Sequence, residues 1–350
     1  MKNIIFIALL AFLSAACTQP VSRSFMAADN PNIAYIGRFD FSDVKRPVFM
    51  YSGCAIRTVF KGTSVELVMK DDSLRNRFTI IIDDSLFVIT ANKRNSSHLL
   101  ATGLQNKKHT LEIIRRTEWH GGNSTFIGLN IDEGKNLYRP EVKERKIEFI
   151  GNSYTCGFGN EGKSRAEHFR YETENNYLTY GAITARTLNA EYFTVCRSGI
   201  GIVQGYGGGK DFTMPKLYDE VTIKNKMTWD FTQFQPQLVV IDLGGNDLSA
   251  PLDSALFVTN YVDFLKRIRK NYASAKFVCV AGPSSPGEKW QKWRRYIHTV
   301  VEQFGEIDPA VYYFEFKTFE PSGSDWHPNV AEHKKMADDL VPFTRKLMNW

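Results

Sequence analysis

Short apolar stretches with strand-like composition fill the first part of the chain, from about Tyr35 to Ile131. They are rich in β-branched and aromatic residues, and clusters of Gly, Asn, Asp and Lys separate them at hairpin-like intervals. No long helical periodicity interrupts them. The pattern therefore predicts an antiparallel β-sandwich, or jelly roll. The clearest stretches are SVELVMK (64–70), FTIIIDDSLFVIT (78–90), HTLEIIRRTE (109–118) and TFIGLNI (125–131).

The pattern changes after a polar segment with a central proline at residues 133–144. From there, near-continuous apolar runs alternate with segments of helical spacing, which is typical of a parallel sheet covered by helices on both faces. We expect a β-sandwich domain over residues 30–140 and an α/β domain over residues 145–350. The expected strands are 146–151, 190–197, 236–245, 275–282 and 311–316, and the expected helices are 174–188, 255–272, 288–305 and a closing helix from Pro328.

The N-terminus has the layout of a bacterial secretion signal. Lys2 precedes an apolar run from Ile4 to Leu13, which is too short for a permanent membrane span, and small residues lead to Cys17. Small residues before a cysteine resemble a lipobox. We therefore expect residues 1–17 to direct export and Cys17 to carry a lipid anchor, with simple secretion after cleavage near Ala16 as the alternative. The expected location is the periplasm or the outer membrane of a bacterium.

Charge and cysteine content narrow the classes of function. The net charge of +6 over 350 residues is spread thinly, and basic residues alternate with acids, so nucleic acid is not an expected partner. Four cysteines follow Cys17 far apart, without the spacing of a zinc site, and each sits in an apolar or glycine-rich run. Buried free thiols are favoured over disulfides for most of the four, and no metal or other cofactor is expected.

Candidate chemistry begins at Ser153, two residues past the apolar strand that ends in Ile150 and Gly151. A serine hydroxyl is a weak nucleophile until a base takes its proton, so a histidine is required elsewhere. His327 is the best placed of the seven histidines, because it lies in a loop just before a helix opened by Pro328. His333, on that helix, is expected to face water.

An acyl-transfer site also needs hydrogen-bond donors directed at the developing oxyanion. Asn246 follows the Gly-Gly end of the third expected strand, and its side-chain amide can donate. Gly201 follows the second strand and can offer a backbone N–H without an obstructing side chain. The amide of Ser153 would be a third donor, and Asp247 is expected to be a structural hydrogen-bonding residue.

These blocks resemble the SGNH, or GDSL-like, hydrolases, a flavodoxin-like α/β family of esterases. The matching blocks are GNS at 151–153, a glycine after the second strand, GGND at 244–247 and DWHP at 325–328. The longer run GNSYTCGFGNEG, the preceding β-domain and the DWHP ending further resemble carbohydrate esterase family 2. Its members pair a jelly roll with an SGNH domain and remove O-acetyl groups from plant polysaccharides.

The resemblance implies that Ser153 is the nucleophile and His327 the general base and then acid, with Ser153, Gly201 and Asn246 as oxyanion donors. Two positions depart from the usual pattern. Asn152 replaces the usual aspartate of the first block, and an amide can hold that loop as well. Ser324 replaces the usual acid three residues before the histidine, so either Asp325 or a backbone carbonyl orients His327.

The expected protein is thus a secreted serine esterase that deacetylates a glycan such as xylan or glucomannan. Trp326, beside the base, is expected to stack on a sugar ring, with a place in the core as the alternative. Trp290 and Trp293 share a helical stripe with core residues and are expected to be buried. The rival interpretations are a lipase or thioesterase of the same fold and a non-catalytic, glycan-binding surface lipoprotein. A membrane is expected to be contacted through the lipid anchor only.

Overall fold

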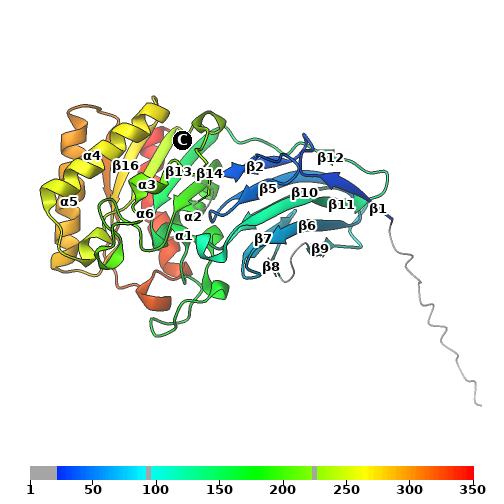
Figure 1. Ribbon diagram of the computed structural model, residues 1–350, viewed down its shortest axis with the longest axis horizontal. Helices are drawn as coiled ribbons and strands as arrows, with labels where there is room; N and C mark the ends of the chain where they lie inside the picture. Colours follow the sequence, from blue (N-terminus) through cyan, green and yellow to red (C-terminus); the bar gives the residue numbers. More distant parts are fainter. Residues whose placement is uncertain (1–21, 92–95, 223–226) are drawn as a thin grey trace, which may run out of the picture.

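The N-terminal part of the molecule is a β-sandwich. The computed structural model describes residues 22–91, 96–222 and 227–350, and Figure 1 shows the sandwich in blue and cyan beside the α/β part. One sheet has the order β3-β4-β11-β6-β9 with β1 added to β11, and the other has the order β12-β5-β10-β7-β8 with β2 added to β5. The strands are β1 (Arg23–Ala27), β2 (Ala34–Ile36), β3 (Phe39–Asp40), β4 (Val48–Phe49), β5 (Ala55–Gly62), β6 (Val65–Asp71), β7 (Arg77–Ile82), β8 (Ser85–Thr90), β9 (Ser96–Ala101), β10 (Lys107–Arg115), β11 (Ser124–Asp132) and β12 (Leu137–Tyr138).

The C-terminal part is built on a five-stranded sheet with the order β14-β13-β15-β16-β17, and all of its neighbouring strands are parallel. In order along the chain this is 2-1-3-4-5, the flavodoxin-like arrangement, whose crevice lies at the carboxyl ends of strands 1 and 3. The strands are β13 (Arg145–Gly151), β14 (Ala190–Cys196), β15 (Leu238–Asp242), β16 (Lys276–Ala281) and β17 (Val311–Glu315). The helices are α1 (Ser153–Cys156), α2 (Tyr180–Thr187), α3 (Met214–Leu217), α4 (Ser254–Asn271), α5 (Glu288–Gly305) and α6 (Val330–Met348).

Helices cover both faces of the parallel sheet, as the doubly apolar strands require. On one face, Phe149 packs with Tyr180 of α2 and Leu340 of α6 in one buried cluster. On the other face, Ile241 packs with residues of α4 and α5, and this cluster continues without a break into the core of the sandwich. The two domains therefore share one hydrophobic core.

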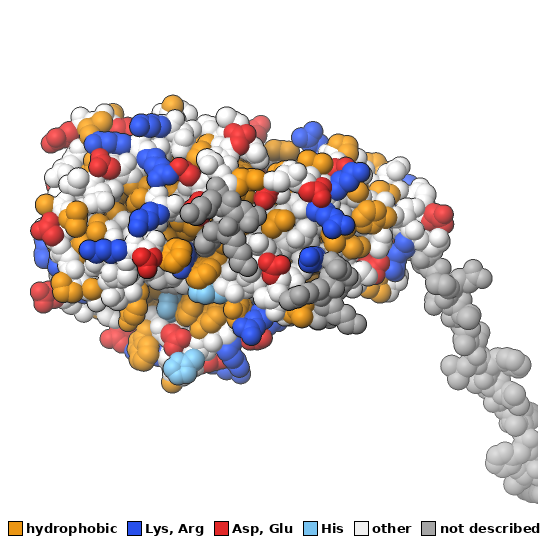
Figure 2. Space-filling model, viewed as in Figure 1, with side chains coloured by type: hydrophobic (Ala, Val, Ile, Leu, Met, Phe, Trp, Pro, Cys, Tyr) orange, Lys and Arg blue, Asp and Glu red, His pale blue; other side chains and the backbone are white. Residues whose placement is uncertain are grey.

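Polar contacts also join the two domains. Arg38 of the sandwich and Glu148 of β13 are both fully buried, with Nη2 and Oε1 3.6 Å apart. Arg57 of β5 contacts Glu191 of β14 at 2.6 Å. Figure 2 shows the domains in contact, with positive and negative side chains interspersed over the visible face.

The sandwich and the parallel α/β domain confirm the predicted fold class. The predicted helix 174–188 begins only at Tyr180, because Thr179 is its N-cap and short 3₁₀ turns precede it. The strand predicted over 236–245 ends at Asp242, and Gly244 then turns the chain with φ 110°. Cys54, Cys156, Cys196 and Cys279 are buried free thiols, as predicted.

The helices of the structure bear on whether the chain could span a membrane. None of the helices in the described ranges has the length and apolar character needed to cross a bilayer. The export segment and Cys17 lie outside the described residues.

His333 was predicted to face water, but it is buried. It is 1% exposed, and its Nδ1 accepts a hydrogen bond from the Tyr180 amide at 3.3 Å. Burial lowers the pKa of His333 to about 3.

Candidate active site

Ser153 lies at the end of β13, at the turn into α1. Gly151 is required at the end of the strand, because a Cβ there would lie 1.9 Å from Oγ1 of Thr155. Asn152 then caps α1: its Oδ1 accepts from the Tyr154 amide at 2.9 Å, and its Nδ2 donates to the Asp242 carbonyl at 3.1 Å. The amide side chain therefore holds the loop, and Ser153 is presented at the mouth of a pocket.

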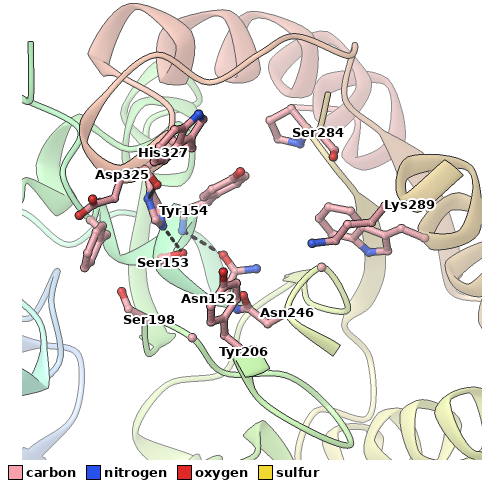
Figure 3. Close-up of a pocket in the computed structure, with 16 residues that line it drawn as sticks. Asn152, Ser153, Tyr154, Ser198, Tyr206, Asn246, Ser284, Lys289, Asp325 and His327 are labelled. Carbon is pink, nitrogen blue, oxygen red and sulfur yellow. Dashed lines mark hydrogen bonds between the residues drawn. The ribbon is translucent and has the colours of Figure 1, made fainter. Parts of the chain in front are cut away.

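His327 approaches Ser153 from the loop before α6. Its Nε2 lies 2.9 Å from the Ser153 Oγ, and its Nδ1 lies 2.9 Å from the Asp325 carbonyl and 3.2 Å from the Ser324 carbonyl. Carbonyl oxygens only accept hydrogen bonds, so Nδ1 carries the proton and Nε2 is free to accept one from the serine. Figure 3 shows this contact. Removal from water lowers the pKa of His327, which keeps the imidazole neutral, so that Nε2 is free to accept the serine proton.

The Asp325 carboxylate does not orient His327, which corrects one of the two expectations. It accepts hydrogen bonds from the Phe169 amide at 2.8 Å and from His168 Nδ1 at 3.0 Å. The cause is the backbone, because Asp325 and Trp326 have positive φ values of 48° and 58°. This turn directs main-chain carbonyls at the imidazole and the carboxylate away from it, as Figure 3 shows. Orientation by a backbone carbonyl, the alternative expectation, is what the structure contains.

Ser324 also shows why no carboxylate stands at the usual position of the acid. Ser324 is fully buried and packs against two glycines of the loop after α1. A Cβ on Gly162 would lie 2.0 Å from the Ser324 Oγ, and one on Gly159 would lie 2.6 Å from its Cβ. The site around Ser324 therefore has no room for a longer side chain.

The expected oxyanion donors are only partly brought together. Asn246 lines the pocket and donates through Nδ2 to the Ile200 carbonyl at 2.9 Å, which leaves the second hydrogen of that amide group for a ligand. Gly201 is not in the pocket wall: its Cβ direction points at Asp247, 2.3 Å from a carboxylate oxygen. Gly199, two residues earlier, lines the pocket instead.

Gly199 rather than Gly201 lines the pocket for a physical reason. The Asp247 carboxylate accepts hydrogen bonds from the amides of Ile202, Val203 and Gln204, and this draws the chain after Gly201 into the interior. Gly199 adopts φ 78°, and within the described residues its N–H donates to no partner. Asp247 is thus a structural residue, as predicted, and the Gly199 amide replaces that of Gly201 as the candidate donor.

The pocket has a volume of about 630 Å³ and an aromatic rim. Trp326 is 62% exposed and Tyr206 is 75% exposed, so Trp326 is not a core residue. Trp290 and Trp293 are buried, as predicted, although Trp293 also forms part of the pocket wall. Lys289 and Ser284 lie across the pocket from Ser153 (Figure 3).

Sequence reasoning missed several residues of the wall. Phe158 lies against the imidazole of His327 with the two rings tilted by 40° and their centroids 4.4 Å apart, and it stacks on Phe169 at 4.2 Å. These contacts and those of Tyr206 and Lys289 depend on how loops fold over the sheet edge, for which a single sequence carries no periodic signal.

Two family models match the chain. Residues 35–140 match the model "Carbohydrate esterase 2 N-terminal", and residues 149–335 match the "GDSL-like Lipase/Acylhydrolase family". An acetylxylan esterase / glucomannan deacetylase of Cellvibrio japonicus is 31% identical over 92% of this chain and 93% of its own length. The chain belongs to carbohydrate esterase family 2.

Other relatives of this family 2 esterase agree. The cellulase/esterase CelE of Acetivibrio thermocellus is 38% identical over 92% of this chain, which spans only 40% of the length of CelE. A family two carbohydrate esterase from Clostridium thermocellum, solved in complex with cellohexaose, superposes with a TM-score of 0.87 at 36% identity, covering 91% of this chain and 99% of that one. A family two enzyme from Cellvibrio japonicus gives 0.88 at 27% identity over 95% and 99% of the two chains. The protein is therefore a carboxylic ester hydrolase of the carbohydrate esterase type.

Proposed function

We propose that the protein releases acetate from O-acetylated polysaccharide through an acetyl-enzyme on Ser153. The observation that carries this proposal is the 2.9 Å contact between His327 Nε2 and the Ser153 Oγ at the mouth of the pocket. A serine hydrogen-bonded to a neutral imidazole whose other nitrogen is held by carbonyls has what nucleophilic catalysis of acyl transfer requires.

In the first half-reaction, the Ser153 Oγ attacks the carbonyl carbon of the acetyl group while its proton passes to His327 Nε2. The negative charge that develops on the carbonyl oxygen is stabilised by the amides of Ser153 and Gly199 and by the Asn246 side chain. The imidazolium then gives its proton to the departing sugar oxygen, so the alcohol leaves and Ser153 carries the acetyl group. Carbonyls of residues 324 and 325 accept from Nδ1 throughout and stabilise the imidazolium.

In the second half-reaction, water takes the place of the sugar alcohol. His327 Nε2 accepts a proton from the water as its oxygen attacks the acetyl carbon. The tetrahedral intermediate then collapses, the Ser153 Oγ regains a proton from the imidazolium, and acetic acid leaves and ionises to acetate in solution. Each half-reaction moves one proton through the same nitrogen, so no further acid or base is needed.

The glycan specificity rests on the rim and on the relatives. Trp326 and Tyr206 present exposed aromatic faces at the pocket, and such faces suit stacking on sugar rings. Relatives are named acetylxylan esterase / glucomannan deacetylase, and one structure holds cellohexaose. Acetylated xylan or glucomannan is therefore the proposed substrate, with an oligosaccharide bound along the aromatic rim.

The direct test compares acetate release by the wild type and the Ser153→Ala variant from p-nitrophenyl acetate and from acetylated xylan, mannan and peptidoglycan. We expect the variant to lose nearly all activity on every substrate and the wild type to prefer xylan or mannan. Retention of most activity by the variant would refute the assignment of the nucleophile.

Two other outcomes would redirect the proposal. A rate that rises with acyl length from acetate to long chains would favour a lipase or thioesterase. Tight binding of polysaccharide without acetate release would favour a non-catalytic glycan-binding protein.

We also propose that the enzyme acts outside the cytoplasm, tethered through a lipid on Cys17. The support is the apolar run with small residues before that cysteine. Metabolic labelling with a fatty acid should mark the wild type, and Cys17→Ala should abolish the label. An unlabelled but exported wild type would instead favour simple secretion.

A further inference from the structure

A buried carboxylate of the β-domain, that of Glu118, contacts the residue next to Gly199 of the pocket wall. Glu118 follows β10 and precedes the 3₁₀ turn Trp119–Gly121, and it is fully buried. Its Oε2 accepts a hydrogen bond from the Ser198 amide at 2.7 Å, and its Oε1 accepts one from the Ser198 hydroxyl. Ser198 directly precedes Gly199, the glycine of the pocket wall.

The same carboxylate contacts the segment that carries the nucleophile. Cys156, the last residue of α1, places its Sγ 3.5 Å from Oε2 of Glu118. One side chain of the sandwich thus connects α1, which begins at Ser153, with the loop after β14 that contains Gly199. Strand ends alone leave the relative position of these two segments to loop conformation, whereas a shared carboxylate fixes it.

Neighbouring groups from the same turn strengthen this attachment. The guanidinium of Arg197 lies 4.1 Å from the ring centroid of Trp119 and 3.8 Å from that of Phe212. Two flat aromatic faces therefore clasp the residue just before Ser198, and one of them belongs to the β-domain.

The charge of Glu118 is set by its surroundings. Burial opposes ionisation, but the nearby imidazole of His120, with Nδ1 3.6 Å from Oε1, and the hydrogen bonds from Ser198 outweigh it and hold the pKa of Glu118 below its usual range. Glu174, buried beside it, has its pKa raised well above its usual range by burial and by the charge of Glu118. Glu118 is therefore the ionised acid of the pair, and each of its two oxygens accepts a hydrogen bond from Ser198.

From these contacts we propose that Glu118 is a positioning residue for the reaction: it holds Ser198 so that the next amide, that of Gly199, faces the acetyl oxygen in the transition state. The β-domain thereby completes the oxyanion site of the hydrolase domain. The inference rests on the proposed function, because the oxyanion site has a role only if Ser153 is acylated.

The test measures kcat and KM on p-nitrophenyl acetate for the full chain with Glu118→Ala and Glu118→Gln. Active sites are counted by complete labelling of Ser153 with a fluorophosphonate. Loss of an oxyanion donor costs about 100-fold or more in kcat, so we expect Glu118→Ala to lose about 100-fold per labelled site, with KM within about threefold. Glu118→Gln keeps one acceptor oxygen and should recover part of the rate, to a loss of about tenfold.

A purely structural role would give a different pattern. It would reduce the labelled fraction and the melting temperature but leave kcat per labelled site unchanged. The matched control is Glu191→Gln, which weakens a different interdomain contact, the one with Arg57, near the start of β14, the strand that leads to Ser198. We expect this control to lower the melting temperature and leave kcat unchanged.

Values of kcat per labelled site within about twofold of wild type in both Glu118 variants would overturn the proposal, and so would a loss confined to KM. If Glu118→Ala yields no folded protein, the Glu118→Gln result decides alone by the same limits. Failure here leaves the proposed function intact as long as the wild type releases acetate and Ser153→Ala does not.

Discussion

The nucleophile and the base of this enzyme are held in different ways. Ser153 stands at the end of a central strand, after the buried helix cap Asn152 and after Gly151, a position where only glycine fits beside Thr155. His327 stands on a loop, where two residues of positive φ direct carbonyls at its imidazole.

Ser153 is thus positioned by the end of a buried strand, and His327 by the local geometry of its turn. Contacts at a strand end are shared with the core, so changes there affect stability as well as activity. The imidazole Nδ1 of His327 is oriented by main-chain carbonyls, so we expect most side-chain changes near His327 to leave its orientation intact. The two regions should therefore respond differently to substitution.

The largest effect is expected for His327→Ala, which removes the base. Loss of one member of such a catalytic set costs about 10⁴-fold to 10⁶-fold in kcat. The melting temperature should change little, since the Asp325 carboxylate still holds the loop through the Phe169 amide when the imidazole is removed. Turnover of p-nitrophenyl acetate and a thermal scan measure both, with His298→Ala, an exposed helical histidine, as the control. A loss below about tenfold would contradict the role of His327.

Asn246→Ala should have the next largest effect, about 100-fold to 1000-fold in kcat, because it removes one donor to the oxyanion. KM should hardly change, since that donor acts mainly in the transition state. Asn260→Ala is a matched control, because its side chain lies on α4 away from the pocket and donates to the Leu256 carbonyl at 2.8 Å. Steady-state kinetics on p-nitrophenyl acetate would show the difference. A change in KM alone would indicate that Asn246 binds the ground state instead.

A smaller effect, on stability rather than rate, is expected at Asp242 beneath the nucleophile. Burial raises its pKa to about 8, although the Tyr180 hydroxyl acts in the opposite direction. The folded state thus holds this proton more tightly than the unfolded chain does. Its contribution to stability is complete below about pH 4 and is lost as the pH rises toward 8.

Asp242→Asn removes this titration, so its stability should depend less on pH. Between pH 5 and pH 9 the free energy of unfolding of the wild type should therefore fall by about 1 kcal/mol or more relative to that of the variant. Urea unfolding at the two pH values measures this, with the exposed Asp263→Asn as the control. An equal change in the free energy of unfolding between the two pH values for Asp242→Asn and the wild type would show that Asp242 does not titrate in this range.

The fold and the reacting pair were accessible from sequence, whereas the supports of the pair were not. Apolar periodicity and strand-end glycines predict the sheet, and the order of the blocks brings Ser153 and His327 to one edge. Which of two nearby glycines faces the pocket depends on the three amides that Asp247 attracts, a contact without local signature. The direction of the Asp325 carboxylate depends on the positive φ angles of Asp325 and Trp326. Residues other than glycine rarely adopt such angles, so the sequence gives no signal for them.

Asp325→Asn tests the central claim most directly, because asparagine tolerates positive φ and can still accept from the Phe169 amide. In a triad, replacing the orienting aspartate by asparagine lowers kcat about 10⁴-fold. Main-chain carbonyls orient His327 here, so we predict a kcat on p-nitrophenyl acetate within about tenfold of wild type. A fall of about 10⁴-fold, close to that of His327→Ala, would contradict the account.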